Sequence, residues 1–148
     1  MKRLNTVLAT LFLSATAALA GGDGWMTDLD KAMEQSKAEK KPILVEFTGS
    51  DWCPPCKMMR AEVFTKKKFI EAATKKFILV ELDFPRGDEA LAKKNQPLAK
   101  KYKIEGFPTV ILLDDSQKEF DRFFASKYPS IEAFLAHLDQ SLDRQDLE

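Results

Sequence analysis

Two cysteines, Cys53 and Cys56, stand between an apolar run and the start of a predicted helix, and this arrangement constrains the fold more than any other feature. The apolar run, Ile43–Thr48, is almost unbroken and carries one acid, Glu46, which is typical of a strand buried on both faces. From Cys53 onward, apolar side chains recur at helical spacing. The cysteine pair therefore lies at a junction between a strand and a helix.

The rest of the chain alternates helices and strands in the same way. Further strands are predicted over Phe77–Asp83, Thr109–Leu113 and Lys118–Phe124. The first helix is predicted to begin near Trp25, with Thr27 or Asp28 as N-cap, and to end at the Lys-rich stretch before Pro42. Further helices are predicted from Cys53 to Val63, over a segment capped by Thr65, over Asp88–Lys103 with a break at Pro97, and after the N-cap Ser130. This alternation predicts an α/β fold with a central mixed sheet of four to five strands and helices on both faces.

Length and composition limit the possible functions. The chain has 148 residues, which corresponds to one domain, and 45% of them are hydrophobic, enough for a core. Basic and acidic residues balance at 23 each, so no bulk field attracts nucleic acid or an anionic membrane. Two cysteines and one histidine fall short of a four-ligand zinc site unless carboxylates contribute.

The first twenty residues have the pattern of a secretory signal peptide. Two basic residues precede a mostly apolar segment, Leu4–Leu19, and the small residues Ala18 and Ala20 mark a cleavage site after Ala20. The alternative is an uncleaved membrane anchor, which needs roughly 20 strongly apolar residues. Cleavage would leave residues 21–148 as one domain in the periplasm or outside the cell. Because these compartments are oxidising, the cysteine pair there is expected to form a disulfide or to exchange one.

The cysteine spacing suits dithiol–disulfide exchange. A helix N-terminus places positive partial charge beside Cys53 and favours its thiolate, so Cys53 is predicted to be the nucleophile. Cys56, one helical turn further on, is predicted to be the resolving sulfur. The alternatives are a static structural disulfide and half of a zinc site, for which no second ligand pair is present.

The two prolines between the cysteines predict the direction of exchange. Pro54 and Pro55 have no backbone N–H group and cannot donate to the Cys53 thiolate. No histidine lies between the cysteines to supply positive charge. A less stabilised thiolate makes the reduced form less stable and the pair more reducing. We therefore predict a reductase rather than an oxidase.

Two blocks of sequence resemble the thioredoxin superfamily. The first is Ile43–Phe47 followed by Trp52-Cys53-Pro54-Pro55-Cys56-Lys57, and the second, about fifty residues later, is Ile104-Glu105-Gly106-Phe107-Pro108-Thr109-Val110. The resemblance covers residues 29–142 and implies a thioredoxin fold. The chain looks most similar to secreted bacterial thioredoxin-like proteins and to the C-terminal domain of the transmembrane periplasmic disulfide reductant.

The resemblance also implies roles for two residues of the second block. Pro108 is expected to be cis and to pack against the cysteine pair, and Phe107 to offer its backbone to an extended substrate peptide. Trp52 is expected to shield the disulfide and to give the substrate a flat contact surface, although plain packing is the alternative. Lys57 either supports the thiolate by its charge or is an ordinary solvated residue.

The chain departs from the family at the buried acid. The family usually has Asp where Glu46 stands, the loop to Cys53 is one residue longer, and the lysine expected on the next strand is replaced by Glu81. We interpret Glu46 as a catalytic acid that helps Cys56 lose or regain its proton, because a charge within a central strand is costly without a task. The alternative is a carboxylate that reaches solvent at a sheet edge.

Together these observations predict an exported protein-disulfide reductase. Its clients would be disulfide-containing proteins, and its electron donor, by resemblance, a membrane or thioredoxin-like protein. The chain is expected to be a monomer that needs no soluble cofactor, because no Gly-rich phosphate loop is present. The alternatives are a disulfide oxidase or isomerase, a non-catalytic peptide-binding module, and a metal-delivery protein. His137 is expected to be an exposed or core-edge residue rather than a metal ligand.

Overall fold

The computed structural model describes residues 24–147, so the predicted signal peptide and its cleavage site lie outside the described residues. A five-stranded sheet with strand order β1-β3-β2-β4-β5 forms the centre. The middle strand β2 (Ile43–Thr48) runs parallel to β3 (Ile78–Asp83) and antiparallel to β4 (Thr109–Leu113). The mixed sheet of four to five strands predicted from the sequence is therefore confirmed.

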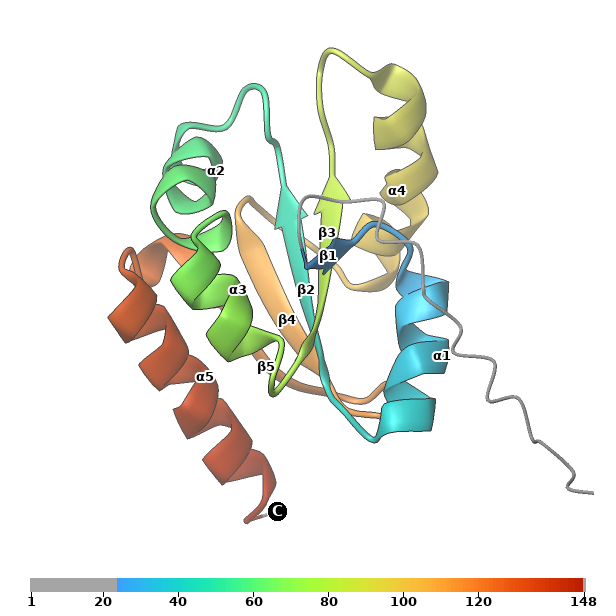
Figure 1. Ribbon diagram of the computed structural model, residues 1–148. Helices are drawn as coiled ribbons and strands as arrows, with labels where there is room; N and C mark the ends of the chain where they lie inside the picture. The colour runs from blue at the N-terminus through green and yellow to red at the C-terminus, as the bar shows by residue number, and fades with distance from the viewer. Residues whose placement is uncertain (1–23, 148) are drawn as a thin grey trace, which may run out of the picture.

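Two strands complete the edges of the sheet. β1 (Trp25–Met26) pairs in parallel with β3, and β5 (Glu119–Phe124) pairs antiparallel with β4. The helices that flank the sheet are α1 (Leu29–Glu39), α2 (Pro54–Met59), α3 (Lys67–Ala73), α4 (Glu89–Lys101) and α5 (Ile131–Gln145), with a π-helical segment η1 (Arg60–Phe64) after α2 and a short 3-10 helix η2 (Ala125–Lys127). α1 and α4 cover one face, and α2, α3 and α5 cover the other (Figure 1).

Side chains of β2 alternate between two cores, one on each face of the sheet. Val45 and Phe47 pack in the core beneath α1 and α4. Leu44 packs in the core with Met59 of α2 and with residues of α3 and α5. Glu46 is two residues from Leu44, so it points to the α2 face as well. The fold therefore places this acid on the same face as the helix that carries the cysteines.

Helix caps follow the sequence. Asp28 accepts a hydrogen bond from Lys31 N at 3.1 Å and begins α1, and Ser130 accepts one from Ala133 N at 3.2 Å and begins α5. These side chains satisfy backbone N–H groups that have no partner within the helix. The predictions of these two N-caps are confirmed.

Trp25 does not belong to the first helix, and this prediction was wrong. It lies in β1, and its indole N–H donates to the Phe64 carbonyl at 3.1 Å. Its ring also packs against Phe64 with centroids 5.4 Å apart. Trp25 stands four residues before Leu29, which is a helical spacing, but the chain at Trp25 pairs with β3 and the helix begins only at Leu29.

Two further details of the predicted helices were wrong. α4 continues through Pro97. Pro97 has no N–H group, so the Lys93 carbonyl loses its helical partner, but both residues are exposed and that carbonyl can bind water instead. Thr65 does not cap α3, since its hydroxyl donates back to the Arg60 carbonyl at 2.8 Å and closes η1. Lys66 precedes α3 instead and makes no side-chain cap bond.

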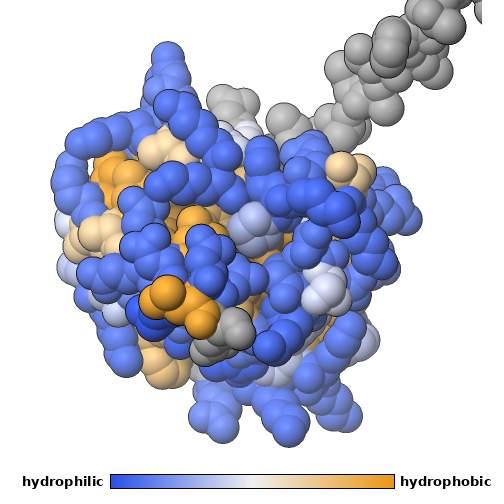
Figure 2. All heavy atoms as spheres, turned by 90° about the horizontal axis from the view of Figure 1, so that it is seen from below, coloured by the Kyte–Doolittle hydropathy of each residue, from blue (hydrophilic) through white to orange (hydrophobic). Residues whose placement is uncertain are grey.

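The end of the molecule opposite α2 carries a mostly hydrophilic surface. Seen from below, charged and polar side chains dominate this face, and apolar side chains form small separate groups (Figure 2). Within residues 24–147, no helix has both the length and the apolar character needed to cross a membrane.

Candidate active site

Cys53 and Cys56 form a disulfide at the N-terminus of α2, with Cα atoms 5.2 Å apart. Cys53 is the N-cap residue of the helix and has extended backbone angles. Pro54 and Pro55 occupy the first helical positions, where a missing N–H group costs no helical hydrogen bond. Both cysteines are buried, whereas the two prolines are exposed. The motif is thus built from a strand end, a cap and a first helical turn.

Gly49 holds the end of β2 against the cysteine pair. Its N–H donates to Cys56 Sγ at 3.5 Å, and its carbonyl accepts from Cys53 N at 2.9 Å. A Cβ atom at this position would lie 2.5 Å from the Trp52 ring. Only glycine therefore allows the Trp52 ring to lie against this turn.

The residues that precede Cys53 are fastened to the loop after β3. Ser50 donates from its backbone N–H to Asp83 at 2.9 Å and from its hydroxyl to the other carboxylate oxygen. Asp51 accepts from Arg86 N at 3.0 Å and from Gly87 N at 2.7 Å, and these bonds lower the pKa of its carboxyl group. The longer loop between β2 and α2 is therefore held in one position.

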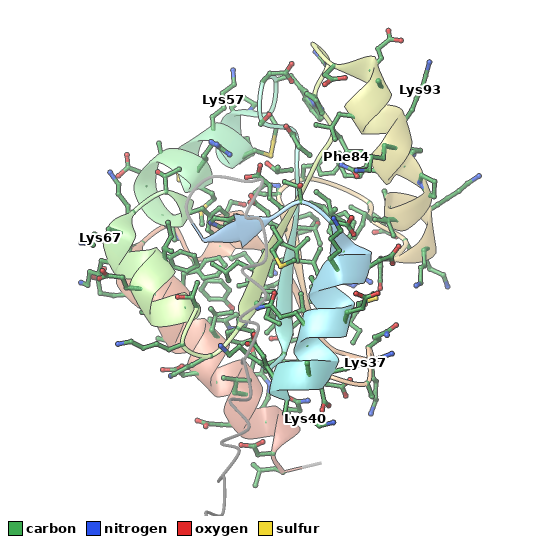
Figure 3. All side chains as sticks on the ribbon, turned by 45° about the vertical axis from the view of Figure 1, so that its right-hand side comes forward. Lys37, Lys40, Lys57, Lys67, Phe84 and Lys93 are labelled. Atoms are coloured by element: carbon green, nitrogen blue, oxygen red, sulfur yellow. A yellow bond between two sulfur atoms is a disulfide. The ribbon has the colours of Figure 1, made fainter. Side chains whose placement is uncertain are left out.

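Trp52 sits in an aromatic group beside the disulfide. Its indole N–H donates to the Phe84 carbonyl at 2.9 Å, and its ring meets the Phe107 ring edge to face at a centroid distance of 5.8 Å. Phe84 and Phe107 also contact each other, with centroids 5.2 Å apart. Phe84 lies between α4 and the sheet (Figure 3). The expected role of Trp52 in shielding the disulfide and contacting substrate stays a prediction.

A groove runs along this aromatic group and past the exposed side of the motif. Its volume is about 630 Å³, and it is lined by Cys53, Trp52, Phe107, both prolines of the motif and the facing side of α4. The peptide bond between Phe107 and Pro108 is cis, and the Pro108 carbonyl accepts from Ala125 N at 2.9 Å. Pro108 itself is buried behind the groove.

Glu46 is buried in the central strand, with 2% of its surface exposed. The alternative in which its carboxylate reaches solvent at a sheet edge is therefore wrong. Burial raises the pKa of Glu46 well above its ordinary value, because it disfavours the charged form, and the nearby Glu81 carboxylate raises it further. Glu46 is thus an acid that holds its proton more strongly than an exposed glutamate.

Arg60 is a residue of this site that the sequence analysis did not identify. It follows Cys56 by four residues, and its Nη1 atom donates to Glu81 Oε2 at 2.8 Å. Burial raises the pKa of Glu81, and Arg60 opposes that rise. The sequence did contain a signal for it: Glu81 replaces the expected lysine, and the carboxyl group of buried Glu46 then needs a cation from another element.

Lys57 and His137 lie outside the group formed by Glu46, Glu81 and Arg60. Lys57 is exposed and extends outward from α2 (Figure 3). His137 is half-buried in α5, stacked on Tyr128 at a centroid distance of 4.1 Å, with Nε2 3.2 Å from Asp121. It is a core-edge residue, as predicted. Among residues 24–147, no three His, Cys, Asp or Glu side chains are grouped to hold a metal ion.

A disulfide between cysteines at this spacing, at a helix N-terminus in this fold, defines a thiol–disulfide oxidoreductase. The chain belongs to the thioredoxin-like family, whose model matches residues 24–115. The resemblance found in the sequence is therefore confirmed.

Two similar proteins come from Chlamydia pneumoniae. The chain is 34% identical over 113 residues to the disulfide bond reductase DsbH, covering 74% of this chain and 68% of that protein. It is also 34% identical over 129 residues to the thioredoxin-related protein DsbJ, covering 82% of this chain. The alignment spans only 37% of the length of DsbJ.

Solved structures agree with the family assignment. A structure titled DsbH oxidoreductase superimposes with a TM-score of 0.73 at 30% identity, covering 91% of this chain and 95% of that one. The C-terminal domain of DsbD from Neisseria meningitidis shares the fold, with a TM-score of 0.58 at 22% identity over 76% of this chain and 93% of that one.

Proposed function

We propose that this chain reduces disulfides in client proteins, with Cys53 as the nucleophile and Cys56 as the resolving cysteine. The observation that carries the direction is the position of Pro55 at the second residue of α2. An N-cap side chain normally accepts from the N–H groups of the second or third helical residue, and Cys53 makes no such bond. Because Pro55 has no N–H group, only the N–H of the third helical residue, Cys56, remains for a Cys53 thiolate.

A poorly stabilised thiolate makes the dithiol a better electron donor. The similarity to a relative named as a disulfide bond reductase supports the same direction. An oxidase or isomerase on this fold would need a more stable reduced form, and neither a histidine nor a backbone N–H group lies between the cysteines to provide it.

The proposed reaction has two exchange steps. The Cys53 thiolate attacks one sulfur of the client disulfide, that S–S bond breaks, and a client thiolate leaves with the bonding electrons. Cys56 then attacks Cys53 Sγ in the mixed disulfide and releases the second client thiolate. Two electrons pass from the dithiol to the client, and the chain ends as the Cys53–Cys56 disulfide present in the structure.

Glu46 is proposed to accept the proton of Cys56 before the second step and to return it when the pair is reduced again. Its raised pKa supports this role, because a group works best as acid and base when its pKa approaches the working pH. Its place on the α2 face of β2 puts it on the same side of the sheet as Cys56.

The groove is proposed to bind the client chain. Trp52 and Phe107 line it beside Cys53, and the backbone next to Pro108 would align an extended peptide. Exposed Lys57 would add positive charge on α2 outside this groove. We further propose that the N-terminal segment directs export, that a membrane or thioredoxin-like protein supplies the electrons, and that no soluble cofactor takes part.

The reduction potential of residues 21–148 tests the direction. The protein would be equilibrated in thiol buffers while Trp52 fluorescence reports the state of the neighbouring disulfide. Trp25, which is buried in the core beneath α2, α3 and α5, adds a background signal. A value near about −270 mV, as in thioredoxin, is expected for a reductase. A value near or above about −180 mV would overturn the proposal in favour of an oxidase or isomerase. The Cys53→Ser variant is the control, because its fluorescence should not respond to the buffer.

A further inference from the structure

A group of charges lies on the α2 face of the sheet, and part of it has no role in the exchange steps. Glu46 of β2 and Glu81 of β3 are paired in register, so their side chains leave the same face of neighbouring strands. Asp83 follows two residues later on β3 and faces the same way. The guanidinium of Arg60 is bound to Glu81 at 2.8 Å. One cation therefore faces several carboxyl groups.

The helix that carries Cys56 also delivers this cation. Arg60 lies four residues after Cys56, and its backbone N–H donates to the Cys56 carbonyl, as in a regular helical turn. Side chains four residues apart share a helix face. Cys56 and Arg60 are thus presented together to the face of β2 and β3 that carries Glu46 and Glu81.

Solvent reaches one side of this group and not the other. A cavity of about 440 Å³ is lined by Arg60 and Glu81, together with Trp25, Phe64 and other residues of η1 and α3. The Arg60 and Glu81 side chains are 47% and 22% exposed, whereas Glu46 is 2% exposed. The ion pair therefore lies between Glu46 and the solvent of this cavity.

We propose that Arg60 and Glu81 are positioning residues that control when Glu46 accepts the proton of Cys56. This inference rests on the role of Glu46 proposed above and deepens it. In the step concerned, the Cys56 thiol gives its proton to the Glu46 carboxylate, and the resulting thiolate attacks Cys53 Sγ. The client thiolate leaves with the electrons of the broken bond and takes a proton from water, so atoms and electrons balance.

The two members of the ion pair act on Glu46 with opposite sign. Burial is the largest influence on the pKa of Glu46 and raises it; Glu81 raises it further, Arg60 lowers it, and Asp83 adds a smaller rise. These groups from β3 and η1, with the Thr48 hydroxyl from β2, face Glu46, and Cys56 of α2 lies on the same side of the sheet. Loss of Arg60 should therefore strengthen proton binding at Glu46, and loss of the Glu81 charge should weaken it.

The pH dependence of the resolving step tests this inference. Reduced protein is mixed with Ellman's disulfide, and thionitrobenzoate leaves twice: first when Cys53 attacks and again when Cys56 resolves the mixed disulfide. The rate of the second release is measured against pH. Arg60→Met should move the midpoint up by about 1 pH unit, and Glu81→Gln should move it down by a similar amount. The midpoint belongs to the coupled Glu46–Cys56 pair rather than to either residue alone.

Matched variants separate charge from packing. Lys67→Met removes another cation from the same cavity, but Lys67 faces Glu71 at 3.6 Å, so the midpoint should stay in place. Arg60→Lys keeps the charge and should retain the original midpoint even if its affinity for Glu81 differs. Shifts of Arg60→Met and Glu81→Gln in the same direction, or no shift in either, would overturn the inference, because a loose core would affect both variants alike.

The Glu46→Gln background distinguishes this inference from the role of Glu46 itself. If Glu46→Gln leaves the original profile unchanged, the proposed role of Glu46 fails, and this inference fails with it. If Glu46→Gln changes the profile, Arg60→Met should cause no further shift in that background. A shift that persists there would show that Arg60 acts on Cys56 directly, and it would overturn the inference alone.

Discussion

The guanidinium of Arg86 lies over the Trp52 ring, 4.7 Å from its centroid, while the backbone N–H of the same residue donates to Asp51 at 3.0 Å. One residue of the loop between β3 and α4 therefore holds both residues that precede Cys53. A cation stacked on an aromatic face stabilises the ring in one orientation. Because Trp52 lines the groove, its orientation determines the surface that a client meets.

Arg86→Ala is expected to weaken client binding by about two- to fivefold, the effect of losing one exposed cation–π contact. The KM for an insulin-type protein disulfide should rise while kcat stays nearly constant, because Arg86 does not act on the sulfur atoms. Trp52 fluorescence should change in parallel. Lys93→Ala is the control, since Lys93 is an exposed residue of α4 that pairs only with nearby Glu89. A fall in kcat with unchanged KM would contradict this prediction.

Cys56→Ser is expected to trap clients as mixed disulfides on Cys53, because the second exchange step loses its nucleophile. Cys53→Ser should trap nothing and should lose all reductase activity. Non-reducing electrophoresis with and without dithiothreitol measures both outcomes. A non-catalytic peptide-binding module makes the opposite prediction, since Cys53→Ser would then leave function intact.

The strands nearest the site could be predicted from the sequence because local signals define them. β2 and β4 have the predicted bounds, since each is a mostly apolar run that begins directly after a proline. The cysteine motif was equally local. β1 was missed because it has only two residues and forms only by pairing with β3, more than fifty residues away in the sequence. Local periodicity contains no information about such a partner.

The charge group beneath α2 depends on the same kind of distant pairing. The sequence identified Glu46 and the unusual Glu81, but Arg60 meets Glu81 across 21 residues of chain. Arg60 keeps α-helical spacing from Cys56, whose carbonyl accepts from its N–H, but that spacing contains no information about Glu81. Burial of Glu46 was predicted from the apolar run around it, but the position of β2 between β3 and β4, which excludes a sheet edge, follows from the order of the strands.

Glu46→Gln is expected to stabilise the oxidised protein at neutral and alkaline pH. The folded-state pKa of Glu46 is raised, mainly by burial, so the folded protein binds this proton more strongly than the unfolded chain. Stability is therefore lost as the pH rises through the range from the ordinary glutamate pKa to the higher folded value. Gln is neutral and similar in size, so it avoids this loss.

Urea unfolding at about pH 5 and about pH 8 measures this effect. The free energy of unfolding of Glu46→Gln should exceed that of the original protein by more at the higher pH. Glu71→Gln is the control, because the Glu71 side chain is exposed on α3, and it should show no such pH-dependent gain. An equal or smaller gain at the higher pH would show that Glu46 is not held protonated by the fold.

Pro55→Ala is expected to raise the reduction potential by about 20 mV, because it returns one N–H donor to the N-cap thiolate and a net hydrogen bond is worth about 1 kcal/mol. Pro54→Ala is the matched control: the N–H of the first helical residue does not normally reach an N-cap side chain, so its effect should be smaller. Pro55→His returns the same N–H donor and adds a side chain that is positively charged when protonated, so it should raise the potential further. Equal potentials for the two alanine variants would show that the thiolate does not depend on this helix N-terminus, and the structural argument for a reductase would then lose its basis.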